Sequence, residues 1–500
     1  MAAQNVDVLI VGAGLSGIGA GYHLQRYCPQ KSYAILEGRE RLGGTWDLFR
    51  YPGVRSDSDM FTLGYSFRPW TEAKSIADGP SILKYVAETA AAYGIDKKIT
   101  YNSRVKSAAW SSEDAKWTVQ VSHGADAELA TYTCNFLFMC SGYYKYEQGY
   151  TPEFPGAAAF GGQIIHPQKW PENLDYTDKR VVVIGSGATA VTLVPALAET
   201  ARHVTMLQRS PTYMVSRPSI DTRADWIRGH LPAKAAHAVV RWRNVLWGMY
   251  IYRIAKRRPD GLKQFLVNAV QEQLDPGYDV KTHFTPTYKP WDQRLCLVPD
   301  GDMFKAIKAN RASVVTDEIE SFTATGVKLK SGGELPADII VTATGLDLVA
   351  LGDVQLSVDG KLVDPAKSLV YKGMMYSDVP NMAAAFGYTN ASWTLKCDLT
   401  CEYVCRMLNH MDKQGFKQCV ARRDPSIGEE PWVDFSSGYI QRAAGKLPKQ
   451  GTKMPWKLHQ NYARDLLALR FGSLNDNVLQ FSAPGKASLP QAPTVQAKSA

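Results

Sequence analysis

The chain has 500 residues, of which 45% are apolar and 21% charged, and a formal net charge of +9. This length exceeds what one hydrophobic core usually serves, so we expect two or three domains in a soluble globular protein. The charge is thinly spread and forms no dense basic tail, which argues against nucleic-acid binding but suits anionic cofactors.

The first predicted element is an apolar run at residues 6–11, which is too short to cross a membrane and has no signal-peptide features. It predicts a buried strand, and the turn Gly12-Ala13-Gly14-Leu15-Ser16-Gly17 follows it directly. In such a turn Gly12 allows the tight bend, Gly14 lets the backbone approach a pyrophosphate, and Gly17 lets the next helix pack closely.

An acidic residue, Glu37, ends the next predicted strand, Ser32–Leu36. A carboxylate at that point accepts hydrogen bonds from a ribose diol and repels a 2′-phosphate. The first unit is therefore predicted to bind FAD or NAD rather than NADP. A glycine turn in an unrelated α/β protein is the weaker alternative.

A helical run, Ser81–Tyr93, and two strand-like runs, Trp117–Ser122 and Phe136–Met139, come next. This alternation predicts an α/β fold with a mostly parallel sheet and covering helices.

A second unit repeats the same order of strand, glycine turn and helix. Strand Val181–Ile184 leads into Gly185-Ser186-Gly187-Ala188-Thr189-Ala190, with a predicted helix at 188–201 and a strand at 203–207. This unit ends in Arg209 and Ser210, and a cation with a hydroxyl suits the 2′-phosphate of NADP. Arg209 as a solvated strand-end residue is the alternative. The contrast with Glu37 predicts two Rossmann-like domains, one for FAD and one for NADPH.

Long helices rich in tryptophan and arginine replace the α/β pattern at about 218–285, which predicts a helical insertion in the second domain. In this stretch, basic residues flank an aromatic helix at residues 241–258. That pattern allows a peripheral membrane contact. We favour the other interpretation, a helical cap over a tunnel for apolar substrates.

The strand and turn at 338–345 resume the α/β pattern. We expect residues 1–145 and 375–481 to form a discontinuous FAD-binding domain and residues 146–374 to form the NADPH-binding domain. Residues 482–500, rich in Pro, Ala, Ser and Gln, predict a disordered tail.

The eight cysteines form no CxxC pair, which is typical of reduced thiols in a cytoplasmic protein. Cys397, Cys401 and Cys405 recur at every fourth position and so share one face of a predicted helix. No histidine is interleaved with them, so we interpret them as core residues rather than metal ligands and predict no metal site.

Two further segments resemble signatures of the type I Baeyer–Villiger monooxygenases. One is the run GGTWDLFRYPGVRSD at residues 43–57, and the other is the pattern FxGxxxHxxxWP from Phe160 to Pro171. The likeness extends over nearly the whole chain and is greatest to the ethionamide-activating subgroup. It implies an enzyme that uses FAD, NADPH and dioxygen to insert oxygen beside a ketone's carbonyl, giving an ester or lactone, and the predicted helical cap favours an apolar ketone. The same oxidant can transfer oxygen to sulfur, so we also expect oxidation of thioethers and thioamides.

The same resemblance implies roles for single residues. Arg294 matches the active-site arginine and Asp57 the acid that orients it, while Gly44, Thr45 and Trp46 belong to the cofactor-binding segment. From the residues alone, Asp57 could equally cap a helix and Arg294 could be an ordinary loop cation.

Three other positions are more open. Gln293 stands where the family often carries a lysine that holds the NADP phosphate, so NADPH recognition would depend more on Arg209. We interpret His166 as a structural hydrogen-bonding residue. Trp393 either faces a cofactor or packs in the core.

Other classes fit less well. A flavin monooxygenase restricted to nitrogen and sulfur oxidation shares the fold and both cofactors, and ketone turnover separates it. A disulfide reductase needs a redox cysteine pair, which the segment after Gly43-Gly44 lacks. A redox-silent binding protein would have little need of two intact glycine turns. The sequence predicts neither the natural ketone nor the oligomeric state.

Overall fold

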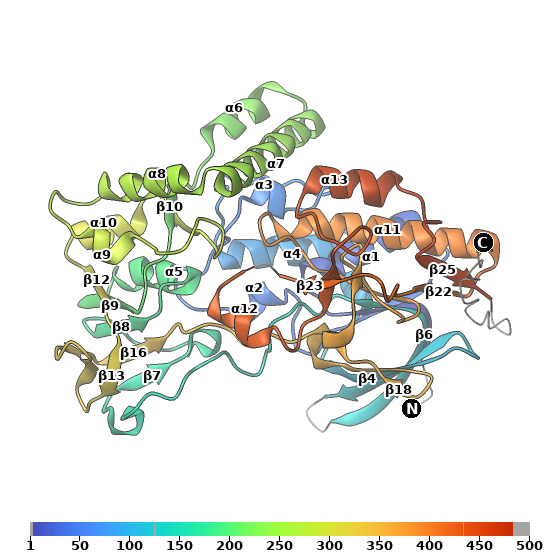
Figure 1. The fold of residues 1–500 in the computed structure, drawn as a ribbon, viewed down its shortest axis with the longest axis horizontal. Coiled ribbons are helices and arrows are strands. Elements are labelled where there is room, and N and C mark those ends of the chain that lie inside the picture. The colour runs from blue at the N-terminus through green and yellow to red at the C-terminus, as the bar shows by residue number, and fades with distance from the viewer. Residues whose placement is uncertain (1–3, 125–126, 434, 484–500) are drawn as a thin grey trace, which may run out of the picture.

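Two α/β units lie next to each other in the computed structural model, which describes residues 4–124, 127–433 and 435–483. The first unit lies on the right of Figure 1 and the second on the left, with the helices of the insertion along the top. This arrangement confirms the predicted fold class of two dinucleotide-binding folds with a helical insertion.

The first unit is built on a mixed sheet in the order β18-β17-β4-β5-β6-β1-β2-β3, with β21 also paired to β6. Its parallel strands are β1 (Gln4–Val11), β2 (Tyr33–Leu36), β3 (Ile99–Thr100), β6 (Glu128–Met139) and β21 (Met382–Ala384). The hairpin strands β4 (Ser103–Ser111) and β5 (Lys116–His123) extend it in antiparallel fashion. Helices α1 (Leu15–Tyr27), α4 (Gly79–Ala92) and α11 (Trp393–Gln414) pack in the same unit.

The second unit has a wholly parallel sheet in the order β12-β9-β8-β16-β7. The strands are β7 (Gln163–Ile165), β8 (Arg180–Ile184), β9 (His203–Gln208), β12 (Ala312–Thr316) and β16 (Ile339–Thr342). Helix α5 (Ala188–Leu197) follows the glycine turn, and α10 (Asp302–Lys308) packs against it. Runs of buried Val and Ile make the adjacent strands β8 and β16, as expected where a sheet is covered on both faces.

The insertion lies between two paired strands, β10 (Met214–Arg217) and β11 (Cys296–Pro299). It consists of α6 (Thr222–His230), α7 (Ala233–Arg257), α8 (Pro259–Gln271) and α9 (Val280–Phe284). Among the residues that the structure describes, no helix is both long and apolar enough to cross a membrane.

Short elements complete the fold. They are α2 (Thr45–Leu48), α3 (Met60–Leu63), α12 (Gly438–Ala443), α13 (Tyr462–Leu466), β13 (Ile319–Phe322), β14 (Gly326–Leu329), β15 (Glu334–Pro336), β17 (Gln355–Val358), β18 (Lys361–Leu362), β19 (Val370–Tyr371), β20 (Met375–Tyr376), β22 (Gln418–Ala421), β23 (Glu429–Pro431), β24 (Lys449–Gly451) and β25 (Leu479–Ser482).

Two expected boundaries differ from the structure. Strand β17 pairs with β4 of the first sheet, so the chain has returned to the first unit before residue 355 rather than at 375. The sequence did not reveal this return, because β17 and β18 form a two-stranded edge of the sheet with no helix between them. Helix α5 ends at Leu197, four residues before the predicted end at Ala201. Of the expected tail, Ser482 ends β25 and residues 484–500 lie outside the described residues.

All eight cysteines are free and buried, which agrees with their interpretation as core residues. Cys397, Cys401 and Cys405 lie on the buried face of α11. Cys397 contacts Ser16 at 3.3 Å, and the Cys28 thiol donates to the Cys405 carbonyl of α11, so these small side chains let α1 and α11 approach closely.

Candidate cofactor and active site

The first glycine turn is as tight as the sequence predicts. Gly12 has φ +105°, and a Cβ there would lie 2.5 Å from the carbonyl oxygen of Cys140. A Cβ at Gly17 would lie 1.9 Å from the Gly12 carbonyl oxygen, so only glycine fits at this position in the first turn of α1. Gly14 faces Gly44, whose Cα would be 3.5 Å from an added Cβ. Two stretches of bare backbone thus meet where the helix N-terminus opens.

Glu37 stabilises this turn through hydrogen bonds to the backbone. Its side chain is buried, and its two oxygens accept hydrogen bonds from the backbone N–H groups of Ala13 (2.7 Å) and Arg39 (3.0 Å). Burial raises the pKa of Glu37, although both hydrogen bonds oppose this. Each oxygen keeps a lone pair, and the residue lines the cavity described below.

The second turn is more open. Gly185 has φ +131°, and a Cβ there would lie 2.3 Å from the Ala343 carbonyl oxygen. A Cβ on Gly187 would meet nothing within 4 Å, so free space lies over this turn. Helix α5 begins at the next residue, Ala188, and Thr189 in its first turn lines the cavity.

Arg209 and Ser210 follow β9, as predicted, and both are exposed. Arg209 lines the cavity, whereas Ser210 is not among the described residues that do so. The Ser210 carbonyl accepts a hydrogen bond of 2.9 Å from the Ser186 hydroxyl, which ties the strand end to the glycine turn.

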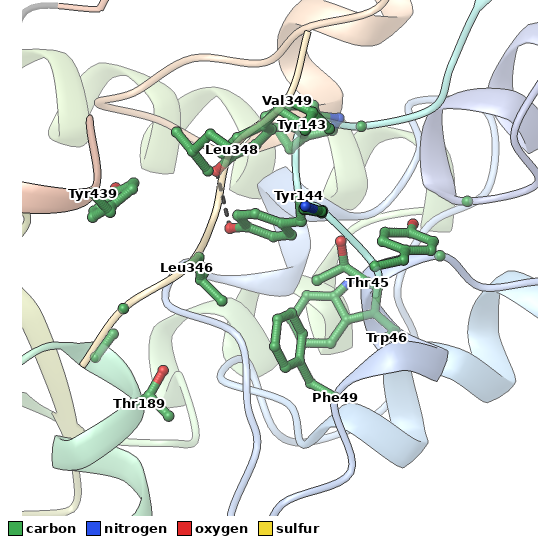
Figure 2. A pocket seen from close by; sticks show the side chains of 18 of the residues that line it. Thr45, Trp46, Phe49, Tyr143, Tyr144, Thr189, Leu346, Leu348, Val349 and Tyr439 are labelled. Carbon is green, nitrogen blue, oxygen red and sulfur yellow. Dashed lines mark hydrogen bonds between the residues drawn. The ribbon is translucent and has the colours of Figure 1, made fainter. Parts of the chain in front are cut away.

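Both turns open into a single cavity of about 870 Å³, with Gly12, Gly14, Gly185 and Gly187 in its wall. Figure 2 shows part of this wall, with Thr45, Trp46 and Phe49 on one side and Thr189 and Tyr439 across from them. A cavity of this size lies at the upper end of those that hold small ligands and cofactors.

Arg294 and Asp57 form an ion pair in the wall of this cavity. The Arg294 Nε lies 2.8 Å from the Asp57 carboxylate, and Nη1 donates to the Thr389 carbonyl at 3.2 Å. A third of the Arg294 side-chain surface is open. Burial opposes its charge, yet Asp57 and three nearby tyrosine hydroxyls raise the pKa of Arg294 above its ordinary value. The guanidinium is therefore permanently charged, fixed, and accessible from the cavity.

Three tyrosines surround this ion pair, and sequence reasoning missed them. The hydroxyls of Tyr143 and Tyr144 lie 3.0 Å apart, as the dashed line in Figure 2 shows, and Tyr439 of α12 lines the same cavity. Burial raises the pKa of all three, so they stay neutral. A signal was available for two of them, because Tyr143 and Tyr144 follow β6 at the carboxyl edge of the sheet, where ligands of such folds bind.

The segment after Gly43 is held by charges that the sequence did not single out. Gly44 has φ +56° and precedes α2, which carries Thr45 and Trp46 into the cavity wall. Asp47 on the other side of α2 is only 1% exposed, and its carboxylate lies 2.6 Å from Arg39 and 2.8 Å from Arg50. This pairing fixes α2 against the strand end that carries Glu37.

The residues that the sequence left open now have defined contacts. His166 accepts from the Gln168 N–H at Nδ1 and so donates from Nε2 to the Gly345 carbonyl at 3.1 Å, which are the contacts of a structural residue. Trp393 lines the cavity and also packs in the core, since it stacks on Tyr143 and donates to the Ser16 hydroxyl. Gln293 lines the cavity beside Arg294.

Comparison with known proteins bears on this site. A family model for flavin-binding monooxygenase-like proteins matches residues 71–225, and one for NAD(P)-binding Rossmann-like domains matches residues 10–76. The FAD-containing monooxygenase EthA of Mycobacterium tuberculosis is 56% identical over 96% of this chain and 98% of its own length.

The chain belongs to the FAD-containing monooxygenases. A second relative, the probable FAD-binding monooxygenase AlmA of an Acinetobacter species, is 50% identical to this chain over 97% of each sequence. Among solved structures, cyclohexanone monooxygenase from Rhodococcus sp. Phi1, bound to NADP+, superposes with a TM-score of 0.75. The two chains are 19% identical, and the superposition covers 96% of this chain and all of the other. This likeness shows a shared fold. The resemblance seen in the sequence is confirmed at the level of the FAD-containing monooxygenases.

The residues present fit an FAD-containing monooxygenase. The backbone of Gly14 and Gly44 leaves room for a pyrophosphate at the N-terminus of α1, and Glu37 has free lone pairs for a ribose diol. As a monooxygenase it uses dioxygen and an organic substrate.

Proposed function

We propose that this monooxygenase is an NADPH-dependent Baeyer–Villiger enzyme. In the reaction, a ketone, dioxygen, NADPH and a proton become an ester or lactone, NADP+ and water. The observation that carries the proposal is the Arg294–Asp57 ion pair in the wall of a cavity that both glycine turns share. The NADP+-bound cyclohexanone monooxygenase of similar fold supports it.

FAD would lie on the first turn, with Gly12, Gly14, Gly17, Glu37 and the segment Gly44-Thr45-Trp46 around it. NADPH would lie on the second, with its pyrophosphate at Gly185, Gly187, Ala188 and Thr189 and its 2′-phosphate near Arg209 and Ser210. When bound, FAD accepts hydride from NADPH and activates dioxygen.

Arg294 would supply positive charge where oxygen anions develop, first on the oxygen that attacks the carbonyl and then on the carbonyl oxygen itself. Asp57 would hold the guanidinium through Nε, and because Nη1 donates to the Thr389 carbonyl, Nη2 would be the group free for the reacting oxygens. The neutral hydroxyls of Tyr143, Tyr144 and Tyr439 complete a polar patch, and apolar side chains line the same cavity, with Leu346, Leu348 and Phe386 among them. An apolar ketone or thioether is the substrate class that such walls favour.

The test is the variant Arg294→Ala, assayed with aliphatic ketones and a thioether while NADPH use and product are followed together. We expect ester formation to fall by about 10²- to 10³-fold or more, with FAD content unchanged, because a preorganised donor to the oxyanion is lost. Arg294→Lys should recover part of the activity, since it restores charge without the fixed donors.

Undiminished ester formation by Arg294→Ala would refute the assignment of this residue. Sulfoxide without ester from the unaltered enzyme would instead place it with the flavin monooxygenases that oxidise only heteroatoms.

A further inference from the structure

Helix α7 carries an apolar stripe on its outer face. Val239, Trp242, Leu246 and Tyr250 recur every three or four residues and are 40–55% exposed, and Trp247 beside them is 54% exposed. Helices at the surface of a globular protein ordinarily turn polar residues outward. A contiguous exposed group of this kind, with two tryptophans and a tyrosine, indicates a contact surface.

The same stripe runs into positive charge. Arg253 and Arg257 continue its spacing at the C-terminal end of α7, and Arg258 follows. The 25 residues of α7 include six Lys or Arg and no Asp or Glu. Lys256 lies 3.8 Å from Asp292, but within the described part of the chain Arg253, Arg257 and Arg258 form no ion pair.

The inner face of α7 packs against the wall of the active-site cavity. Val245 is buried against Tyr388 and Leu395, and Met249 and Ala391 join the same cluster. Tyr388 and Ala391 in turn line the cavity. One helix therefore separates the exposed stripe from the site, and Figure 1 shows α6 and α7 projecting at the edge of the molecule, away from both sheets.

We propose that α7 docks the enzyme on an anionic phospholipid bilayer. Trp242, Leu246, Trp247 and Tyr250 would enter the interface between headgroups and acyl chains, while Arg253, Arg257 and Arg258 would contact lipid phosphates. A helical cap, the interpretation favoured from the sequence, accounts for the buried inner face. It gives no reason for an apolar outer face bordered by unpaired arginines, whereas an anionic bilayer matches both features.

Docking bears on the substrate, and this step alone rests on the proposed function. An apolar ketone is concentrated in the bilayer, and the docked helix is the layer next to the cavity wall. The enzyme would then take its substrate from the membrane rather than from water.

The experiment is co-sedimentation of the full chain, with flavin bound, with vesicles of phosphatidylcholine alone or with about 30% phosphatidylglycerol. We expect most of the protein to sediment with the anionic vesicles and little with the neutral ones. Arg253→Gln and Arg257→Gln should each weaken binding about fivefold, because one basic residue near such a surface contributes about that factor. The double variant Leu246→Asp, Trp247→Asp should weaken it at least tenfold.

A matched control is the double variant Leu129→Asp, Leu362→Asp. These two leucines are 69% and 70% exposed, and they lie on β6 and β18 at the other side of the molecule. The control should bind as the unaltered enzyme does. Recovery of the unaltered enzyme in the supernatant with anionic vesicles, or equal loss in both double variants, would overturn the proposal. So would a dimer that Leu246→Asp, Trp247→Asp disperses without any effect on vesicle binding.

This readout is independent of the reaction. Vesicle binding by an enzyme that makes no ester would leave the docking intact and refute only the proposed function.

Discussion

Asp57 and Asp59, which are only two positions apart, have different partners in the structure. Asp59 caps α3 by accepting a hydrogen bond from the Thr62 N–H at 3.0 Å, which leaves Asp57 to pair with Arg294. The local sequence could not decide between the two tasks, because both acids precede a short helix. The choice is made by Arg294, which comes from a segment more than 200 positions away in the chain.

Glycines, in contrast, could be read from local sequence alone. Gly12 and Gly185 are required by their positive φ angles and by carbonyl oxygens close by, and Gly17 by the Gly12 carbonyl oxygen alone, so a short motif is enough to find them. Asp47 and Tyr439 could not be found this way, since each becomes part of the site only through residues of other elements.

At the scale of single residues, we predict that Arg209→Ala weakens the binding of NADPH and leaves the binding of NADH unchanged. Arg209 is the exposed cation of the cavity wall at the end of β9, and charge-assisted hydrogen bonds to a phosphate are worth roughly 1.5–3 kcal/mol. The KM for NADPH should rise about 10- to 100-fold, as steady-state kinetics with both nucleotides would measure.

The reverse change, Gln293→Lys, adds a cation beside Arg294 and should raise the preference for NADPH. Equal losses with NADPH and NADH in Arg209→Ala would show that Arg209 does not read the 2′-phosphate.

At the scale of elements, the insertion is anchored to the first unit by a buried arginine. Arg241 of α7 is 7% exposed, and its Nη1 donates to the carbonyls of Phe61 (3.0 Å) and Gly64 (2.8 Å). Its Nη2 lies 3.7 Å from Asp398 of α11. Although burial opposes its charge, the neighbouring His23 and Arg241 help to hold the pKa of Asp398 below its ordinary value.

We therefore predict that Arg241→Met lowers the free energy of unfolding by about 3–5 kcal/mol, because a buried carboxylate and two main-chain carbonyls lose their partner. Arg243 is the matched control, since it sits two positions further on α7 and pairs with the partly exposed Asp221. Arg243→Met should cost about 1 kcal/mol or less. Urea unfolding followed by flavin fluorescence and circular dichroism measures both, and similar losses in the two variants would show that burial of the pair is unimportant.

Elements were predictable where a strand and helix adjoin a glycine turn, as for β1, α1, β8 and β9. The pairing of β17 with β4 was not, because its partner lies about 250 residues earlier and a four-residue strand has no period of its own. The C-terminal α12 and α13 span only six and five residues, too short for a helical pattern to register, although α12 brings Tyr439 to the site.

At the scale of the whole molecule, the site depends on a fixed distance between the two units. The loop that carries Tyr51, Gly53 and Val54 belongs to the first unit, yet Tyr51 and Val54 lie in the apolar core of the second. Gly53 rests on α5 with φ +76°, and a Cβ there would lie 2.7 Å from the Ala196 side chain and 2.9 Å from the Thr192 carbonyl oxygen. This loop thus sets how closely the two glycine turns approach across the cavity.

We predict that Gly53→Ala separates the turns and slows reduction of FAD by NADPH, with FAD content unchanged. A misplacement of about 1 Å between reacting groups can cost up to 10²-fold, so a fall of at least tenfold in the reduction rate is expected in stopped-flow absorbance. Gly94→Ala is the matched control, because Gly94 has φ +65° and no atom within 4 Å of an added Cβ. It carries the same backbone strain, about 1–2 kcal/mol, without the contact. If Gly94→Ala slowed the reduction as much, strain alone would be responsible. If Gly53→Ala reduced FAD at the unaltered rate, the loop would not set the distance between the cofactors.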